Sequence, residues 1–395
     1  MTKLSSIAYY VTDKISSNDI SLAEYVTTDC ILQNKKGREI AANLPPQPCS
    51  LIRYQRGDVL IANIRPYLKK VWFADIDGGA SPDVLVLRAK NGHSPNFLYA
   101  ILLQDAFFDY VMQGTKGSKM PRGDKEQILR YEMPTFSCSE ENIGRFFLKL
   151  DSKIHLNEQI NQNLEAMAKQ LYDYWFVQFD FPNEEGKPYK SSGGEMVWNE
   201  KLKRKIPNEW DNCKLKDFIN LFDSKRIPLS SKDREERKGN YPYYGATGIM
   251  DYVNEYIFDG DYILLAEDGS TSDSKGFPIV QYIWGKNWVN NHAHIILPKN
   301  EQYLMFTYQM LRSIPAKQIE TGSIQKKISQ ENLCEYNMVL PNSILIEKYE
   351  SIISPLWEKR KLCIEEINAL IKQRDELLPL LMNGQASVNS DLSRD

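Results

Sequence analysis

The sequence predicts a mixed α/β protein in which two similar globules are separated by two long antiparallel coiled-coil helices, as a pseudo-two-fold duplication. Three observations lead to this fold class. Two distant segments match in phase, both halves of the 395 residues repeat one order of elements, and two stretches carry the heptad pattern of a coiled coil.

The duplication is visible in "TKGSKMPRGDKEQILRYEMP", which starts at Thr115, and in "TGSIQKKISQENLCEYNMVLP", which starts at Thr321. Identical residues pair at one constant offset of 205 positions (322 − 117): Gly117 with Gly322, Ser118 with Ser323, Glu126 with Glu331, Tyr131 with Tyr336, and Met133 with Met338. This period is too long for a solenoid repeat and is typical of a duplicated domain.

The first globule is expected over residues 1–138, where short β-like runs such as "DVLIAN" and "DVLVLR" alternate with turn-rich loops. A long helix follows over 139–180. Its apolar residues recur at alternating four- and three-residue steps, with Asn157 and Asn161 as polar interruptions that fix register. The predicted seam comprises Ile143, Phe147, Leu150, Ile154, Leu164, Ala168, Leu171 and Trp175.

Residues 181–205 are rich in Pro, Gly and Ser and are expected to link the two copies. The second globule is expected over 206–342, the second long helix over 343–383, and a flexible tail over 384–395. Pro355 is expected to kink this helix or delay its start. Its seam comprises Ile353, Trp357, Ile364, Ile367, Ile371, Leu378 and Leu381, with Arg360 and Arg374 at the remaining positions.

Composition limits the class of protein. The formal net charge of −3 gives no global signature of nucleic-acid binding, so a binder of this composition must concentrate its positive charge locally or obtain it from partner proteins. The six cysteines are scattered without a CxxC pair, which indicates reduced thiols rather than disulfides or a zinc site. With no signal-peptide core and no membrane-length apolar run, we expect a cytoplasmic protein.

Catalytic signatures are missing from the sequence. The segments "GKPY" and "GKNW" lack the glycine spacing and hydroxyl residue of a phosphate-binding loop, and no tetrapeptide of the amino-methyltransferases occurs. A nuclease interpretation could start from Pro82 and Asp83, but the acidic and lysine pair on the next strand is absent. His292 and His294 could in principle bind a metal, yet a polar pair at a strand edge is the favoured interpretation, so no catalytic or metal residue is expected.

Basic loops recur at equivalent places in the two halves and are the candidate nucleic-acid contacts. Loops that combine Gly, Ser, amides and cations suit phosphates and base edges, although a mixed-charge run is more often a solvated loop. The candidates in the first half are Lys35, Lys36, Arg65, Lys69, Lys116, Ser118, Lys119 and Arg122. Those in the second half are Lys225, Arg226, Tyr244, Thr247, Asp268, Ser270, Thr271, Ser323, Gln325, Lys326 and Lys327.

Four segments together resemble the DNA-specificity subunit of Type I restriction-modification systems. They are "INQNLEAMAKQLYDYWFVQFDFP", "KIPNEWDNCKLKDF", "GDYILLAEDGS" and "GSIQKKISQENL", and they occur in the family's order over nearly the whole chain. The resemblance implies two target-recognition domains, each reading one half of a bipartite asymmetric DNA site. One departure is that "KLSSIAYY" near the N-terminus matches only "KLKDFINL", which predicts a shortened first strand in the first domain.

The resemblance also implies partners and cofactors. The partners are double-stranded DNA, two methyltransferase subunits and the restriction subunits, with no membrane; S-adenosylmethionine, ATP and Mg²⁺ belong to those subunits and none to this chain. The spacer helices set the distance between half-sites, roughly 34 Å for one DNA turn, and dock the partners through residues such as Ile154, Leu164, Leu171, Trp175, Ile364, Ile367, Ile371 and Leu378. Two alternatives stay open: a self-contained restriction or modification enzyme, and a coiled-coil scaffold that binds proteins.

Overall fold

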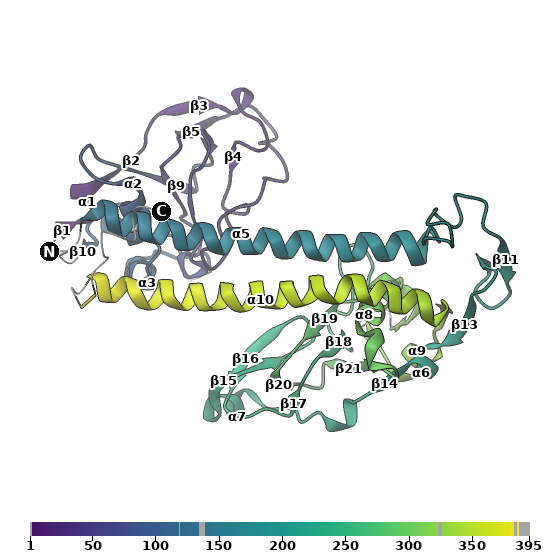
Figure 1. Ribbon diagram of the computed structural model, residues 1–395. Coiled ribbons are helices and arrows are strands. Elements are labelled where there is room, and N and C mark those ends of the chain that lie inside the picture. The colour runs from purple at the N-terminus through teal and green to yellow at the C-terminus, as the bar shows by residue number, and fades with distance from the viewer. Residues whose placement is uncertain (1, 118, 134–138, 323–325, 383–384, 387–395) are drawn as a thin grey trace. The chain divides into compact units, whose positions relative to one another are not determined.

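The computed structural model describes residues 2–117, 119–133, 139–322, 326–382 and 385–386. The chain divides into two compact units, one of residues 1–161 with 362–395 and the other of residues 162–361 (Figure 1). Among the described helices, none is both long and apolar enough to cross a membrane.

The first unit is built on a four-stranded antiparallel sheet. Its strands lie in the order β2 (Ala8–Tyr10), β9 (Val84–Ala89), β6 (Val59–Ala62) and β7 (Val71–Phe73). All four residues of β6 and the first four of β9 are buried. This two-sided burial explains why both strands are continuous apolar runs in the sequence.

Each face of this sheet has its own covering layer. Val59 and Ile61 pack with helices α2 (Pro95–Leu102) and α3 (Asp105–Gln113), whereas Leu60 points into a separate cluster on the other face. That cluster is shared with a second sheet in the order β3 (Lys14–Ser16), β5 (Ser50–Tyr54), β8 (Gly78–Ala80) and β4 (Tyr25–Val26). The short elements α1 (Leu4–Ile7), α4 (Lys125–Leu129), η1 (Ser17–Asp19), η2 (Pro66–Leu68), β1 (Thr2–Lys3) and β10 (Glu132–Met133) complete the globule.

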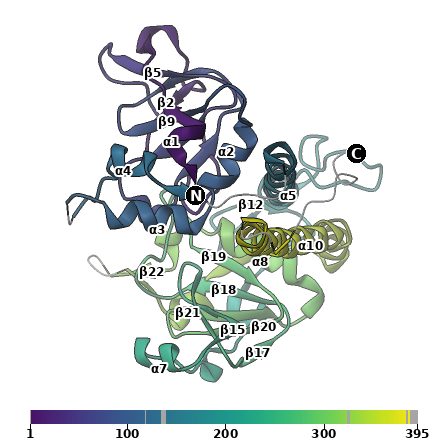
Figure 2. The ribbon, with the colours of Figure 1, turned by 90° about the vertical axis from the view of Figure 1, so that its left-hand side faces the viewer.

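The second unit repeats this plan. Its main sheet has the order β14 (Ile219–Leu221), β21 (Ala293–Pro298), β18 (Tyr262–Ala266) and β19 (Val280–Ile283), and β18 and β21 lie side by side (Figure 2). Its second sheet has the order β16 (Ile249–Val253), β15 (Lys238–Tyr244), β20 (Lys286–Val289) and β17 (Phe258–Asp259). The other elements are α6 (Leu215–Phe218), α7 (Ser231–Glu236), α8 (Leu304–Ser313), α9 (Gln330–Glu335), η4 (Asp223–Lys225), η5 (Glu301–Tyr303), η6 (Ala316–Gln318), β13 (Asp211–Lys214), β22 (Glu320–Thr321), β23 (Lys327–Ile328) and β24 (Asn337–Leu340).

The repeated topology confirms the predicted duplication and the mixed α/β class. The order β2-β9-β6-β7 in one unit corresponds to β14-β21-β18-β19 in the other, and the pair β1-β10 corresponds to β13-β24. Gly117 and Gly322, which match in the sequence, share the left-handed backbone, with φ of 90° and 88°. β1 has two residues and β13 has four, in agreement with a shortened first strand.

Two long helices are shared between the units. Helix α5 (Glu140–Tyr172) ends in a π-helical turn, η3 (Asp173–Val177), and α10 (Ser343–Met382) continues through Pro355 without interruption. The expectation that Pro355 delays the start of this helix is therefore wrong, because the helix begins at Ser343. Ile353 and Trp357 on either side of Pro355 are buried, and this packing offsets the hydrogen bond that proline removes.

Within each unit the two helices pack antiparallel, and they run side by side (Figure 1). In the first unit Asp151 pairs with Arg374 and Asn157 with Glu366; in the second, Glu165 pairs with Arg360. Partner numbers fall as those of α5 rise, which is the signature of an antiparallel pair. Asn157 is 2% exposed and its amide donates to Glu366 at 2.7 Å, so the polar interruption of the seam is satisfied by a partner on α10.

The linker is folded against the second unit. Strands β11 (Met196–Asn199) and β12 (Arg204–Pro207) form an antiparallel hairpin. Before it, Phe181 stacks on both Tyr189 and Trp210, with ring centroids 4.7 Å and 5.1 Å apart. The aromatic residues give this Pro- and Gly-rich stretch a small core of its own contacts, which a composition argument does not reveal.

Candidate nucleic-acid interface

In both units two loops meet by a backbone bridge: the loop that follows β6 or β18, and the loop that contains Arg122 or Lys327. In the first unit the segment after β6 forms a bridge from Ile64 to Arg122, and the Arg65 N–H donates to the Pro121 carbonyl at 2.8 Å. In the second unit the segment after β18 forms a bridge from Asp268 to Lys327. Arg122 and Lys327 are 205 positions apart, so the sequence match and the backbone pairing identify the same place in the duplicated fold.

The first-unit candidates at this place are exposed cations. Arg65 is exposed and has φ of 53°, a left-handed conformation that is unusual for a side-chain-bearing residue and is found at functional sites. Arg122 lies 3.0 Å from the Asp83 carboxylate, and Lys116 lies 3.1 Å from that of Asp124. Lys119 and Lys36 are exposed. Ser118 lies outside the described residues.

Lys35 is a correction to the predicted contacts. It is 5% exposed, and its ammonium lies 2.8 Å from Asp105 and 3.3 Å from Asp375 on α10. Lys69, which is half-buried, also pairs with Asp105 at 2.8 Å. Burial would raise the pKa of Asp105, but the hydrogen bonds and charges of the two lysines outweigh it and lower that pKa. Lys35 therefore holds the globule to the helix and is not available to phosphates.

The second-unit candidates differ in exposure. Lys326 and Lys327 are exposed and pair with Glu320 at 3.2 Å and Glu267 at 3.1 Å. The Asp268 carboxylate lies 2.6 Å from the His292 ring. Ser270, Thr247 and Lys225 are exposed, and Tyr244 is half-buried. Ser323 and Gln325 lie outside the described residues.

Thr271 and Arg226 are further corrections. Thr271 is 1% exposed, and its hydroxyl donates to Glu320 at 2.6 Å. The Arg226 guanidinium donates to Glu267 at 2.7 Å and to the Ala293 carbonyl at 2.8 Å. Both side chains have their hydrogen-bonding groups committed within the protein, so they support the loops rather than face a ligand.

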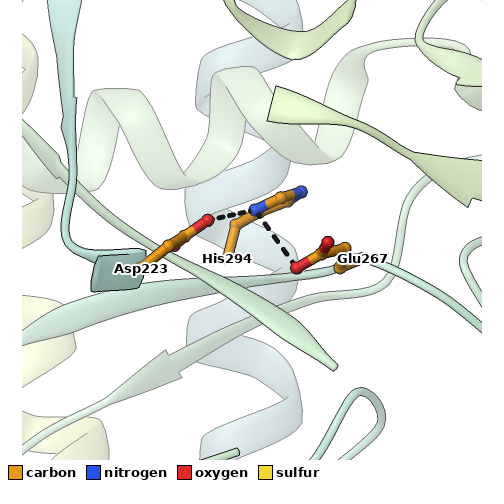
Figure 3. Close-up of side chains that lie close together, drawn as sticks. All are labelled: Asp223, Glu267 and His294. Carbon is orange, nitrogen blue, oxygen red and sulfur yellow. Dashed lines mark hydrogen bonds and ion pairs between the residues drawn. The ribbon is translucent and has the colours of Figure 1, made fainter. Parts of the chain in front are cut away.

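A buried charged cluster lies directly beneath the second-unit loops, and Figure 3 shows Asp223 and Glu267 facing the ring of His294. His294 on β21 is 0% exposed, and its Nδ1 lies 2.6 Å from Asp223 and 3.7 Å from Glu267. Its Nε2 lies 2.7 Å from the Ile328 carbonyl. The sequence prediction of a strand-edge polar pair is wrong for His294, because the fold brings carboxylates from two other segments to it.

The two carboxyls of this cluster are held ionised. Burial would raise the pKa of Asp223, but the hydrogen bond and charge of His294, with donors from Ile295 and Gln330, outweigh it and lower the pKa. Burial would likewise raise the pKa of Glu267, and the hydrogen bond from Arg226, followed by His294 and Lys327, lowers it. No spacing signal could have revealed this cluster, since Asp223 and His294 are 71 residues apart.

The cluster has the side-chain types of a metal site but not the geometry. Zinc-type bonds of about 2.0–2.2 Å in a tetrahedron hold ligand atoms about 3.3 Å apart. The 2.6 Å between His294 and Asp223 is instead a hydrogen-bond distance, and Glu267 already carries Arg226 and Lys327. Asp223, Glu267 and His294 therefore form an ion-pair cluster.

The helix-seam residues named from the sequence line the inner faces of α5 and α10 to different degrees. Ile154 and Trp175 are buried, and Leu164, Leu171, Ile364, Ile367 and Ile371 are half-buried. The side chain of Leu378 lies outside the described residues. Met167, Val177 and Ile352 are exposed apolar residues, and a groove of about 860 Å³ is lined by Met167, Tyr174 and Ile352 together with the seam residues Leu171 and Ile353.

Comparison with known proteins shows which proteins this chain is similar to. Residues 207–367 match the family model described as the Type I restriction modification DNA specificity domain. The MjaIX specificity subunit of Methanocaldococcus jannaschii is 22% identical over 95% of this chain and 86% of its own length. The chain is similar to Type I specificity subunits over nearly its whole length. The recognition proposed from the four sequence segments is thereby confirmed.

Other relatives agree with this family. The HindI specificity subunit of Haemophilus influenzae is 21% identical over 97% of this chain and 98% of its own length. The crystal structure of a Type I S subunit from M. genitalium superposes with a TM-score of 0.58 at 16% identity, covering 96% of this chain and 95% of that one, which shows the common fold. These named relatives are specificity subunits of Type I restriction enzymes.

Proposed function

We propose that this specificity subunit reads a bipartite asymmetric DNA site and directs the methyltransferase and restriction subunits of a Type I complex to it. Each recognition domain, residues 1–138 and 206–342, reads one half-site. Two methyltransferase subunits dock on α5 and α10 and bind S-adenosylmethionine, and the restriction subunits bind ATP and Mg²⁺. The complex works in the cytoplasm.

The observation that carries this proposal is the loop pair that both units build at one place in the fold. The same backbone bridge recurs in both units, from Ile64 to Arg122 in the first and from Asp268 to Lys327 in the second, but the side chains at it differ. The first unit also presents Arg65, next to Ile64, whereas the second has no cation next to Asp268. A repeated frame with different side chains suits the reading of two different half-sites. Arginine, amide and hydroxyl side chains discriminate base edges by about 1–3 kcal/mol for each bidentate contact.

The proposed contacts fall into two groups. Lys36, Lys116, Lys119, Lys225, Lys326 and Lys327 are proposed to contact phosphates, which position the protein without reading sequence. Arg65, Arg122, Tyr244, Thr247, Asp268 and Ser270 are proposed for base edges, together with Ser118, Ser323 and Gln325. Lys69, on Asp105, supports the first-unit loops.

The test is to co-express this chain with its methyltransferase subunit in a host without DNA methylation and to map modified bases by long-read sequencing. We expect one asymmetric bipartite motif, absent when this chain is omitted. DNA changed by the purified chain alone would favour a self-contained enzyme. A stable complex that modifies no motif would favour a protein-binding scaffold.

A further inference from the structure

We propose that His294, in its doubly protonated form, is a positioning residue that holds β23, and with it Lys327, in place for DNA reading by the second recognition domain. The role in DNA reading rests on the proposed function. The structural role does not: it is that the buried imidazolium of His294 on β21 holds the backbone of β23 at Ile328 by a hydrogen bond.

The hydrogen bonds of His294 require both ring nitrogens to donate. The Ile328 carbonyl, 2.7 Å from Nε2, can only accept. The Asp223 carboxylate, 2.6 Å from Nδ1, also accepts N–H donors from Ile295 at 2.9 Å and from Gln330 at 2.5 Å, which suits its ionised form. A neutral ring with its hydrogen on Nε2 would donate to the Ile328 carbonyl but would place the Nδ1 lone pair against the Asp223 carboxylate. Only the imidazolium donates a hydrogen bond to both partners.

The contacts of His294 converge on the DNA-facing loop. The Ile328 carbonyl binds the ring, the Ile328 N–H donates to the Glu267 carbonyl at 2.8 Å, and the Lys327 ammonium lies 3.1 Å from the Glu267 carboxylate. Two of these three contacts hold the backbone directly after Lys327. Loss of the His294 contact releases one of them and widens the range of positions open to Lys327.

Among the residues that the structure describes, two carboxylates face His294 and two cations pair with those carboxylates. Asp223 comes from η4, Arg226 follows it, Glu267 follows β18 and Lys327 lies on β23. Two carboxylates and two cations cancel, so the protonated ring leaves the cluster with a net charge of +1. The negative field of DNA attracts a cluster of that charge.

The first recognition domain supplies an internal control. In the second unit His294 pairs across the sheet with Leu265, and Ala293 pairs with Ala266; in the first, Leu85 pairs with Ile61 and Val84 with Ala62. Leu85 thus occupies the place of His294 and carries no proton. The equivalent loop is held instead by the exposed pair Arg122–Asp83. A proton-dependent effect should appear at one half-site and not at the other.

The test uses the complex of this chain with its methyltransferase subunit and duplexes of the mapped site with single-base changes in each half. The ratio of Kd values for correct and changed duplexes is measured at about pH 6 and about pH 9, the range that spans histidine titration. We expect discrimination at the second-domain half-site to fall about tenfold at the higher pH, as for one lost hydrogen bond to a charged group. Discrimination at the first-domain half-site should stay constant.

Two variants separate positioning from general damage. His294→Gln should discriminate poorly at both pH values and show no pH dependence. Asp223→Asn can donate its amide hydrogen to a neutral ring, so this variant should keep its discrimination at about pH 9. The inference would be overturned if discrimination by the wild type did not change with pH. It would also be overturned if His294→Gln showed the same pH dependence of discrimination as the wild type.

Limited trypsin digestion of the free chain tests the structural part without DNA. We expect faster cleavage after Lys326 and Lys327 in His294→Gln than in the wild type at the same pH. Equal cleavage rates would overturn the positioning role. If the wild-type complex modifies no bipartite motif, the proposed function fails, and the digestion still decides whether His294 anchors β23.

Discussion

Lys35 and Lys36 are adjacent lysines with opposite environments. Lys35 follows the left-handed Asn34, is itself left-handed with φ of 63°, and turns inward to Asp105, whereas Lys36 is exposed. Sequence reasoning treated the two alike because both belong to one basic loop. The difference depends on Asp375, which lies 340 residues further along the chain.

Substitution of these two lysines should therefore have opposite effects. Lys35→Met should lower the free energy of unfolding by about 1–2 kcal/mol, because it leaves Asp105 and Asp375 with one cation fewer. Lys36→Met should change stability by less than about 0.5 kcal/mol but reduce the slope of log Kd against log salt by about 1. Urea unfolding and DNA titrations at several salt concentrations measure the two quantities. The reverse pattern would restore Lys35 as a DNA contact.

Glu350 is a buried carboxyl whose pKa is raised from 4.5 to about 7, chiefly by desolvation, against hydrogen bonds from the Phe306 N–H and Ser354. The folded protein therefore binds this proton more tightly than the unfolded chain. Its contribution to stability is complete below about pH 4.5 and is lost as the pH rises through about 7.

Glu350→Gln should remove this pH dependence. The amide keeps an acceptor for Phe306 and carries no charge, so the variant should be more stable than the wild type at pH 8, by on the order of 3 kcal/mol at most. The two proteins should be alike near pH 4.5. The exposed Glu347→Gln is the matched control, and urea midpoints at the two pH values are the measurement. A wild type with the higher midpoint at pH 8 would refute the assignment.

At the scale of elements, the periodicity of the sequence predicted individual strands and helices but not the contacts between segments that are distant in the sequence. Continuous apolar runs identified β6 and β9, and the heptad steps identified α5 and α10 with their polar seam positions. The hairpin β11–β12 in the linker was missed, since composition there is typical of a loop. The cluster around His294 was missed because its members come from separate elements that only the folded sheet brings together.

Arg374 forms a buried ion pair in the seam between α5 and α10, and its substitution tests how much that seam contributes to stability. It is 4% exposed, and its guanidinium lies 3.6 Å from Asp151 on α5 and 3.0 Å from Asp375. Arg374→Met should destabilise the first unit by about 3 kcal/mol, because it removes the guanidinium beside the buried Asp151 and leaves it only the more distant His155 ring at 3.9 Å. Lys372→Met, two residues earlier on an exposed face, should have almost no effect. Equal urea midpoints for the two variants would argue against a structural role for the pair.

At the scale of the whole molecule, the duplication predicts that the two recognition domains can be altered independently. Arg122→Gln should relax base preference or weaken binding at one half-site only, and Lys327→Gln should act at the other. Each should reduce the salt slope by about 1 if its contact is a phosphate. Methylation mapping of the two variants in the complex measures this. A change in both halves of the motif with either single variant would contradict the division of labour.

The sharing of α10 between the units has a consequence for synthesis. Residues 362–382 of this helix belong to the first unit, so Arg374 and Asp375, which pair with Asp151 and Lys35 of that unit, leave the ribosome only after the whole of the second unit. At about 5–20 residues per second, the 200 residues of the second unit (162–361) take roughly 10–40 s to make. During that time the N-terminal globule lacks its contacts with residues 362–382 of α10. A chain truncated within the second half is therefore released with neither unit complete.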